Sequence, residues 1–198
     1  MICKLTPAAP HLIVFAGHAG TGKSTLAKKA LPLIVDKTGE DYFFLDKDTV
    51  YGAYSAHMME LTTQNPNDRD SPYYLENLRD WEYNGLLDIA KENLLLGVNV
   101  ILVGPFSKEI QCGKIINPNL LGVPPQTTIQ IAWIDLDECE AKSRLQKRGD
   151  PRDDWKLAHW DQYLKRRIQP PSHTLIHRFD NLHFNELEFE KLIDNLVQ

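Results

Sequence analysis

A run of eight residues near the amino terminus has the composition and spacing of a loop that binds a chain of phosphates. A glycine opens the run, and a glycine, a lysine and a serine close it, in the order G-x-x-x-x-G-K-S. Glycines let backbone N–H groups turn toward an anion, Lys23 is expected to reach the β- and γ-phosphates of a nucleoside triphosphate, and the Ser24 hydroxyl is expected to bind Mg²⁺. His18 is expected to contribute its backbone rather than its ring. The predicted nucleotide contacts are Gly17, His18, Ala19, Gly20, Thr21, Gly22, Lys23, Ser24 and Thr25.

Two carboxylates that follow the second apolar run, residues 42–45, suit the same chemistry. Asp46 and Asp48 flank Lys47, and in an extended chain residues two apart point to the same side. If this strand neighbours the first, both carboxylates lie beside the γ-phosphate. Asp46 is then a candidate Mg²⁺ ligand, and Asp48 a candidate base that accepts the proton of an acceptor hydroxyl. The alternative is a solvent-exposed turn at a strand end.

The third apolar run, residues 98–103, does not end in the aspartate that commonly binds Mg²⁺ in phosphate-loop proteins. Gly104 and Pro105 follow it instead. The metal would therefore depend on Ser24 together with Asp46 or Asp48. Asp135 is a further candidate, although with Asp137 it better suits the cap of the helix that follows.

Several arginines could stabilise a phosphoryl group in transfer. Arg144 and Arg148 stand four apart, on one face of a predicted helix, and are candidate catalytic and nucleotide contacts. Arg152 is left open between function and surface. The run 165–167 is expected on the surface, because basic residues suit a helix carboxyl end. Arg79 is a candidate clamp for an anionic acceptor.

The elements that must position these residues alternate along the chain. Apolar runs predict strands near residues 12–16, 42–45, 98–103, 128–134 and 174–179. Helices are predicted from residue 23 to a stop or kink at Pro32, and over 49–63, 74–96, 137–148, 153–167 and 186–197. Such alternation predicts parallel βαβ units in a three-layer α/β fold, with ligands at the carboxyl ends of the strands.

Composition narrows the class of protein. The formal net charge of −5 disfavours general nucleic-acid binding, which usually requires a basic excess. Cys3, Cys112 and Cys139 form no C-x-x-C pair, so neither a zinc ribbon nor a disulfide framework is indicated. The first apolar run is too short to span a membrane. We therefore expect a cytoplasmic protein without a membrane partner.

The motifs resemble those of the P-loop kinase group of small-molecule phosphotransferases, which includes chloramphenicol phosphotransferase, gluconate kinase and shikimate kinase, alongside uncharacterised AAA-type ATP-binding proteins. The residues that carry the resemblance are Gly17–Ser24, Asp46–Asp48, Gly104–Phe106 and Arg144–Lys156. The resemblance implies a P-loop NTPase fold with a five-stranded parallel sheet and a core formed by residues 10–54, 98–136 and 172–198. It also implies an acceptor-binding helical segment at 55–97 and an arginine-bearing helical lid at 137–168.

By this resemblance the chain is expected to transfer the γ-phosphate of ATP, with Mg²⁺, to a hydroxyl of a small molecule that the sequence does not name. Two alternatives remain open. One is a nucleotide-dependent switch or ATPase without a small acceptor, and the other is a toxin-type or polynucleotide kinase. The acidic balance of charge speaks weakly against the last.

Overall fold

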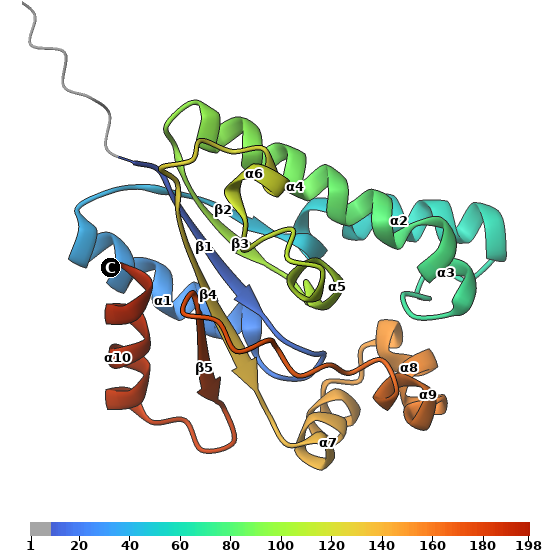
Figure 1. Ribbon diagram of the computed structural model, residues 1–198. Helices are drawn as coiled ribbons and strands as arrows, with labels where there is room; N and C mark the ends of the chain where they lie inside the picture. The colour runs from blue at the N-terminus through green and yellow to red at the C-terminus, as the bar shows by residue number, and fades with distance from the viewer. Residues whose placement is uncertain (1–8) are drawn as a thin grey trace, which may run out of the picture.

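The computed structural model describes residues 9–198, so Cys3 lies outside the described residues. Its centre is one sheet of five parallel strands (Figure 1). In their order across the sheet the strands are β2 (Tyr42–Asp46), β3 (Asn99–Val103), β1 (His11–Ala16), β4 (Thr128–Asp135) and β5 (Ile176–Asp180). All five predicted strands are confirmed to within two residues. The condition that the second strand neighbours the first is not met, because β3 lies between them.

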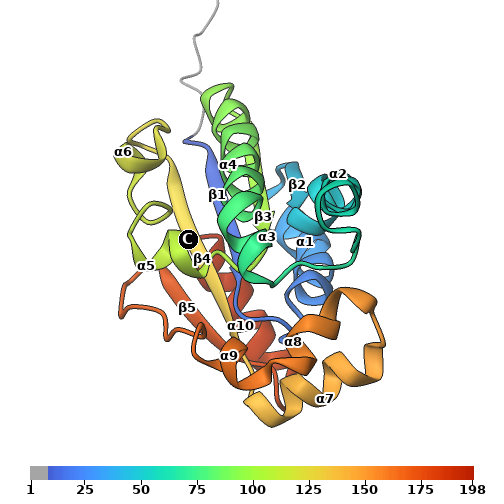
Figure 2. The same ribbon diagram turned by 90° about the vertical axis from the view of Figure 1, so that its right-hand side faces the viewer.

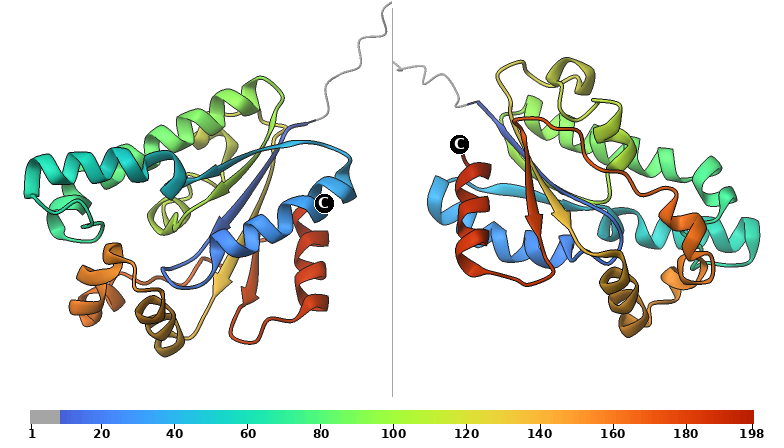
Figure 3. Two further views of the ribbon diagram at one scale, coloured as in Figure 1. Left: turned by 180° about the vertical axis from the view of Figure 1, so that it is seen from behind. Right: turned by 60° about the horizontal axis from the view of Figure 1, so that its bottom comes forward.

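Helices cover both faces of the sheet. α1 (Lys23–Thr38) and α10 (Glu186–Leu196) pack on one face, and α4 (Arg79–Leu95), α5 (Ser107–Gln111) and α6 (Pro118–Leu121) pack on the other. Figure 3 shows the first pair from behind. The fold is therefore a three-layer α/β/α sandwich, as the sequence predicts.

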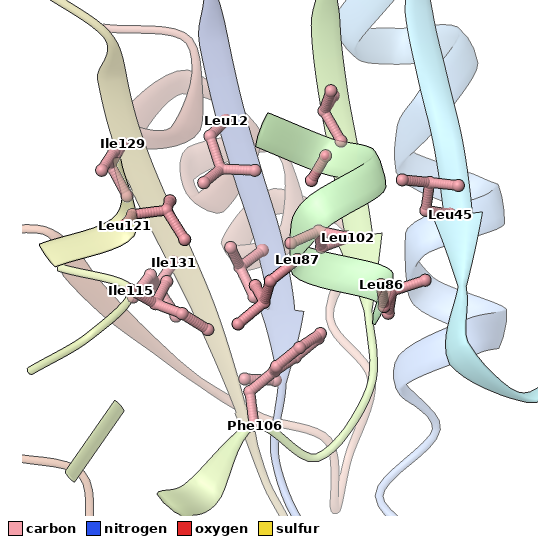
Figure 4. Packing of buried hydrophobic residues seen from close by; sticks show 14 of the residues in the cluster. Leu12, Leu45, Leu86, Leu87, Leu102, Phe106, Ile115, Leu121, Ile129 and Ile131 are labelled. Carbon is pink, nitrogen blue, oxygen red and sulfur yellow. The ribbon is translucent and has the colours of Figure 1, made fainter. Parts of the chain in front are cut away.

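The central strand β1 is apolar on both sides because both sides are buried. Leu12 and Val14 join the cluster under α4, whereas Ile13 and Phe15 join the cluster under α1 and α10, and all four are fully buried. Figure 4 shows part of the first cluster, which includes Leu86 and Leu87 of α4 and Leu12 and Leu102 of the sheet. Burial of this core fixes the strand ends, and with them the site.

The helix predicted from residue 23 does not end at Pro32. α1 continues to Thr38, with Pro32 inside it. A proline removes one helical hydrogen bond, but Ile34 beyond it is fully buried in the core under α1. Tertiary packing of the last turns outweighs the local cost.

The segment between β2 and β3 holds α2 (Lys47–Thr63), α3 (Pro72–Asn77) and α4. The single helix predicted over 74–96 is wrong, because Leu78 leaves regular helical geometry, with φ −119°. Leu78 packs with Met59 and Tyr74 in a separate small core that ties α3 to α2. The break lets α3 turn toward the carboxyl end of the sheet.

The segment between β4 and β5 holds α7 (Glu138–Arg148), a 3₁₀ turn at Pro151–Asp153, α8 (Asp154–Ala158) and α9 (Trp160–Leu164). These helices lie beyond the carboxyl ends of β1 and β4 (Figures 1 and 2). The continuous helix predicted over 153–167 is wrong. At His159 φ is −120° and ψ is 44°, and the ring stacks on Trp155 with centroids 4.4 Å apart.

Three expectations from composition can be compared with the described residues. Cys112 and Cys139 are free, exposed thiols. Across residues 9–198, none of the helices combines the length and apolarity needed to cross a bilayer. The same residues contain no group of three or more His, Cys, Asp or Glu side chains placed to hold a metal ion by themselves.

The ring of His18 fastens the phosphate loop to the chain that follows α9. The residue is buried, and its Nε2 lies 2.9 Å from the carbonyl oxygen of Ile168 and 3.1 Å from its nitrogen. The ring also meets the Trp133 ring edge-on at 5.4 Å, and the neighbouring Ala19 N–H donates to the Tyr163 hydroxyl at 2.9 Å. The sequence predicts a contribution from the His18 backbone rather than from its ring, and these contacts give the ring a structural role as well.

Acid should weaken the fold through His18. Burial lowers the pKa of His18 to about 4 from 6.5, so between these values the unfolded chain binds a proton that the folded chain rejects. Stability therefore rises with pH across this window and is lost on acidification, by up to about 3 kcal/mol. Urea titrations at pH 6.5 and 4.5 should show a larger loss for the wild type than for His18→Gln. Equal losses in the two proteins would remove His18 from the explanation.

Candidate active site

A cavity of about 530 Å³ opens at the carboxyl ends of β1, β2 and β3. Its wall is formed by the phosphate loop, the start of α2, the turn after β3, the stretch 69–83 and parts of 144–168. Cavities of this size hold small organic ligands. Of the predicted site residues, all except Gly17 and Thr21 line it: His18, Ala19, Gly20, Gly22, Lys23, Ser24, Thr25, Asp46, Asp48, Arg79, Arg144 and Arg148.

Gly17 and Thr21 support the phosphate loop from behind. Gly17 has φ +134°, and a Cβ there would lie 2.5 Å from the carbonyl oxygen of Ile134. The Thr21 side chain is fully buried and its hydroxyl donates to the carbonyl of His18 at 3.0 Å. These two residues shape the loop rather than face a ligand.

Lys23 sits at the base of the cavity as a cation without an acidic partner. Its Nζ donates to the carbonyl of His18 at 2.7 Å, and no carboxylate of the described residues lies within 4.0 Å of it. Burial lowers the pKa of Lys23 to about 8, while the nearby charges of Asp48 and Asp46 act in the opposite direction. A phosphate oxygen is the kind of group that this ammonium lacks.

Asp46 and Asp48 both face the cavity, but not as two residues of an extended strand. β2 ends at Asp46 and α2 begins at Lys47, because the Asp46 side chain caps the helix and accepts from the Asp48 N–H at 2.9 Å. The predicted extended geometry is therefore wrong. Both carboxylates still face the same cavity, because the cap residue and the first turn of α2 lie at the same end of the sheet.

The Asp48 carboxylate lies between two cations. Its oxygens are 3.0 Å from Lys47 Nζ and 3.6 Å from Arg152 Nη1. Partial desolvation at the cavity wall acts to raise the pKa of Asp48, but Lys47 and Arg152 hold that pKa below its ordinary value. The group is therefore ionised at neutral pH and ready to accept a hydrogen bond. Arg152, which the sequence left undecided, belongs to the cavity wall.

Lys47 and Glu82 form a buried network that sequence reasoning missed. Lys47 Nζ lies 3.0 Å from Glu82 Oε2, and Glu82 also accepts from the hydroxyls of Tyr74, at 2.8 Å, and Ser55. Glu82 is 2% exposed. Despite burial, the acidic and phenolic neighbours of Lys47 raise its pKa. The partners stand 35 positions apart, so no sequence spacing points to them.

Arg144 and Arg148 line the cavity from α7 and are already engaged. Arg144 donates to Glu140 at 2.8 Å and to the carbonyl of Asn181 at 2.9 Å, and Arg148 Nε donates to Asp153 at 3.0 Å. Both side chains remain partly exposed toward the cavity. They can therefore change partners when an anion enters.

Arg79 lines the cavity, yet protein carboxylates already match its charge. It donates to both oxygens of Glu109, at 2.5 and 2.9 Å, and to Asp80 at 2.9 Å. Its guanidinium carbon lies 3.8 Å from the centroid of the Tyr83 ring. Burial would lower the pKa of Arg79, but the Glu109 and Asp80 pairs raise it. In this geometry Arg79 and Glu109 form an ion pair within the protein, and the charge of Arg79 is not free for an anionic ligand.

Residues 165–167 are not a plain surface run. Arg166 lines the cavity and reaches Asp70 Oδ1 at 3.1 Å, and Arg167 donates to the carbonyl of Leu136 at 3.0 Å. The surface prediction is therefore wrong for both, because the chain turns back across the site after α9 to reach β5. Lys165 alone is exposed.

Asp135 and Asp137 have separate structural roles. Asp135 pairs with Arg178 at 2.7 Å and accepts from the Trp133 indole at 3.0 Å, outside the cavity wall. Asp137 caps α7 by accepting from the Cys139 N–H at 2.8 Å. Asp137 fits the predicted cap, and Asp135 does not.

The donor set around the loop suits Mg²⁺ only in company with phosphates. Ser24, Asp46 and Asp48 line one cavity, but the described residues supply no complete metal cage. Mg²⁺ usually takes one or two protein oxygens and completes its shell with substrate phosphates and water. The second oxygen of Asp46 has no donor among the described residues and is open to such an ion.

Solved structures with the same architecture are distant in sequence. A sugar kinase from Janibacter sp. HTCC2649 is 17% identical and superposes with a TM-score of 0.60 over 95% of this chain and 94% of that one. The APS kinase CysC of Mycobacterium tuberculosis, in complex with AMPPNP and APS, is 17% identical, with a TM-score of 0.62 over 97% and 100%. Kti12 of Chaetomium thermophilum, in complex with ADP-AlF3, is 12% identical, with a TM-score of 0.64 over 94% and 97%. At these identities the likeness concerns the fold, which is that of the P-loop kinases and NTPases.

The sequence itself supplies the family. No curated protein matches it significantly. A family model described as an AAA domain matches residues 12–171. This span includes the phosphate loop, Asp46, Asp48 and all six arginines of the cavity wall. Since this span covers most of the 198 residues, the chain belongs to the AAA-domain family of P-loop proteins.

Proposed function

We propose that this protein is a kinase that transfers the γ-phosphate of ATP to a hydroxyl of a small molecule. One observation carries the proposal. The phosphate loop and the ionised carboxylate of Asp48 face the same cavity, and that cavity continues past them to the stretch 69–83. A switch that only binds nucleotide needs no cavity beyond the terminal phosphate, whereas a kinase needs room for an acceptor.

In this proposal the loop and its lysine hold the triphosphate. Backbone N–H groups between Gly17 and Ser24 surround the phosphates, as glycines at positive φ permit. Lys23 exchanges its bond with the His18 carbonyl for phosphate oxygens. Mg²⁺, held by the Ser24 hydroxyl and Asp46, would neutralise charge on the phosphates. Arg144 and Arg148, on the proposed lid at residues 137–168, turn toward the transferring group.

Asp48 is proposed to orient the acceptor hydroxyl and take its proton. Lys47 and Arg152 keep the carboxylate ionised and fix its position. Glu82 in turn holds Lys47, and so positions Asp48 without touching the acceptor. A loose phosphoryl-transfer transition state leaves positioning and charge as the main sources of rate, which suits this arrangement.

We also propose a cytoplasmic location, where ATP is available and where free thiols such as those of Cys112 and Cys139 persist.

The test of the kinase proposal is transfer of labelled γ-phosphate from ATP to members of a panel of hydroxyl compounds. Label on an organic product supports a kinase. Label released only as inorganic phosphate, unchanged by every acceptor, would replace the kinase with an ATPase.

Nucleotide binding should draw a proton onto Lys23. Because the pKa of Lys23 is about 8 in the free protein and phosphates raise it, binding at pH 8 should take up about half a proton, and almost none at pH 6.5. Calorimetry of MgATP binding at each pH, in buffers of different ionisation enthalpy, measures this uptake.

Lys23→Arg is the control for that measurement, since its guanidinium is protonated at both pH values. Equal uptake by the two proteins at pH 8 would show that another group titrates. Absence of any heat of binding in the wild type would contradict the nucleotide site itself.

Replacing Asp48 by Asn should lower turnover without abolishing nucleotide binding. Loss of a positioned base typically costs a factor of about 10²–10⁴ in kcat. Asp36→Asn is the matched control, because Asp36 is exposed on α1 and outside the cavity wall. Label-transfer rates and MgATP calorimetry should be compared for the three proteins. Unchanged kcat in Asp48→Asn would end the role proposed for this carboxylate.

A further inference from the structure

The cavity wall is basic, but nearly all of its charge is already matched. Every lysine and arginine that lines the cavity has a carboxylate within 4.0 Å, with two exceptions in the part of the chain that the structure describes. The exceptions are Lys23 and Arg69. Because the other lysines and arginines of the same wall are all paired, two unmatched cations in one cavity call for an explanation.

Both exceptions are held in place by main-chain carbonyls. Lys23 donates to the carbonyl of His18. Arg69 donates through Nη1 to the carbonyls of Pro66 and Asp68, each at 2.9 Å, and through Nη2 to the carbonyl of Gly52 at 3.0 Å. Carbonyls fix the position of a guanidinium while leaving its full charge unneutralised. A cation prepared in this way is ready for an anion from outside the protein.

Arg69 occupies the part of the cavity away from the phosphate loop. It stands in the turn between α2 and α3, and its contact with Gly52 places it beside α2, one helical turn beyond Asp48. The four residues from Asp48 to Gly52 correspond to about 6 Å along the helix axis. A small molecule whose hydroxyl meets Asp48 would therefore bring its next few atoms toward Arg69.

We propose that the acceptor is an anionic small molecule, and that Arg69 binds its carboxylate or phosphate group. The proposal rests on the proposed kinase function and names the class of its substrate. Arg79, the sequence-predicted anion clamp, does not take this part, because Glu109 and Asp80 already match its charge. Carbonyls use three of the five N–H groups of Arg69, so its Nε and one hydrogen of its Nη2 remain for the carboxylate or phosphate of a ligand.

Matched pairs of acceptors test the proposal directly. Label transfer from ATP would be measured with gluconate against glucose, and with glycerate and glycerol 3-phosphate against glycerol. We expect transfer to a charged member and little to its neutral partner. In Arg69→Gln the KM for that charged acceptor should rise roughly 10- to 100-fold, with the KM for ATP unchanged. Arg69→Lys, which keeps the charge but not the fork, should fall between.

Arg178→Gln is the control of equal charge change, since Arg178 is exposed, paired with Asp135 and outside the cavity. Its KM values should match those of the wild type. Thermal unfolding of each variant shows whether the loss of the three carbonyl contacts of Arg69 has disturbed the fold. If Arg69→Gln does not fold, Arg69→Lys is compared with the wild type instead. Neutral partners that serve as well as charged ones would overturn the proposal.

A binding measurement decides the matter if no compound of the panel accepts phosphate. Protein loaded with magnesium AMPPNP, whose terminal phosphate fills the loop, would be titrated with sulfate and with acetate. Binding of one further anion in the wild type, lost in Arg69→Gln and kept in Arg178→Gln, supports the site, and preference between the two anions separates a phosphate group from a carboxylate. If the wild-type protein binds no further sulfate or acetate, the proposed anion site at Arg69 is overturned. The kinase proposal itself fails only if the MgATP and label-transfer measurements fail.

Discussion

The close approach of the phosphate loop to its neighbours is the constraint on which the rest of the site depends. A side chain at Gly17 would meet the Ile134 carbonyl at 2.5 Å, and one at Gly20 would meet the Ala141 carbonyl at 2.7 Å. The Asn181 amide also donates to the Thr21 carbonyl at 2.8 Å. The loop therefore packs closely against β4, α7 and the chain that follows β5. Any ligand it holds lies at one fixed place relative to all three.

From that fixed point the charges of the cavity divide into two kinds. In pairs such as Lys47 with Glu82, which is buried, or Arg79 with Glu109, which is partly buried, each charge already has its partner, and these pairs hold the walls in position. Lys23 and Arg69 are held only by carbonyls, so their charge is directed at whatever enters. The formal net charge of −5 therefore says little about this cavity, because it averages over a surface that the ligand never meets.

The sequence predicts the features whose cause is local. The loop motif, the apolar strands and the cap at Asp137 each depend on neighbouring residues, and the structure contains them. The order of β2, β3 and β1, the Lys47–Glu82 pair and the contact of Arg166 with Asp70, 96 positions away, depend on folding of the whole chain. Periodicity tells which face of an element is buried, not which element covers it.

Two such distant contacts, both made by Asp70, link the turn between α2 and α3 to the segment 156–166 on the cavity wall. Asp70, 9% exposed, pairs with Lys156 and with Arg166 across the cavity, and it directly follows Arg69 in the chain. Removing the partners of a buried carboxylate costs about 3–5 kcal/mol. The residues around 156 and 166 therefore cannot swing away from the turn that carries Arg69 without exposing or neutralising Asp70. The two segments move together, or the one that moves must offer Asp70 another cation.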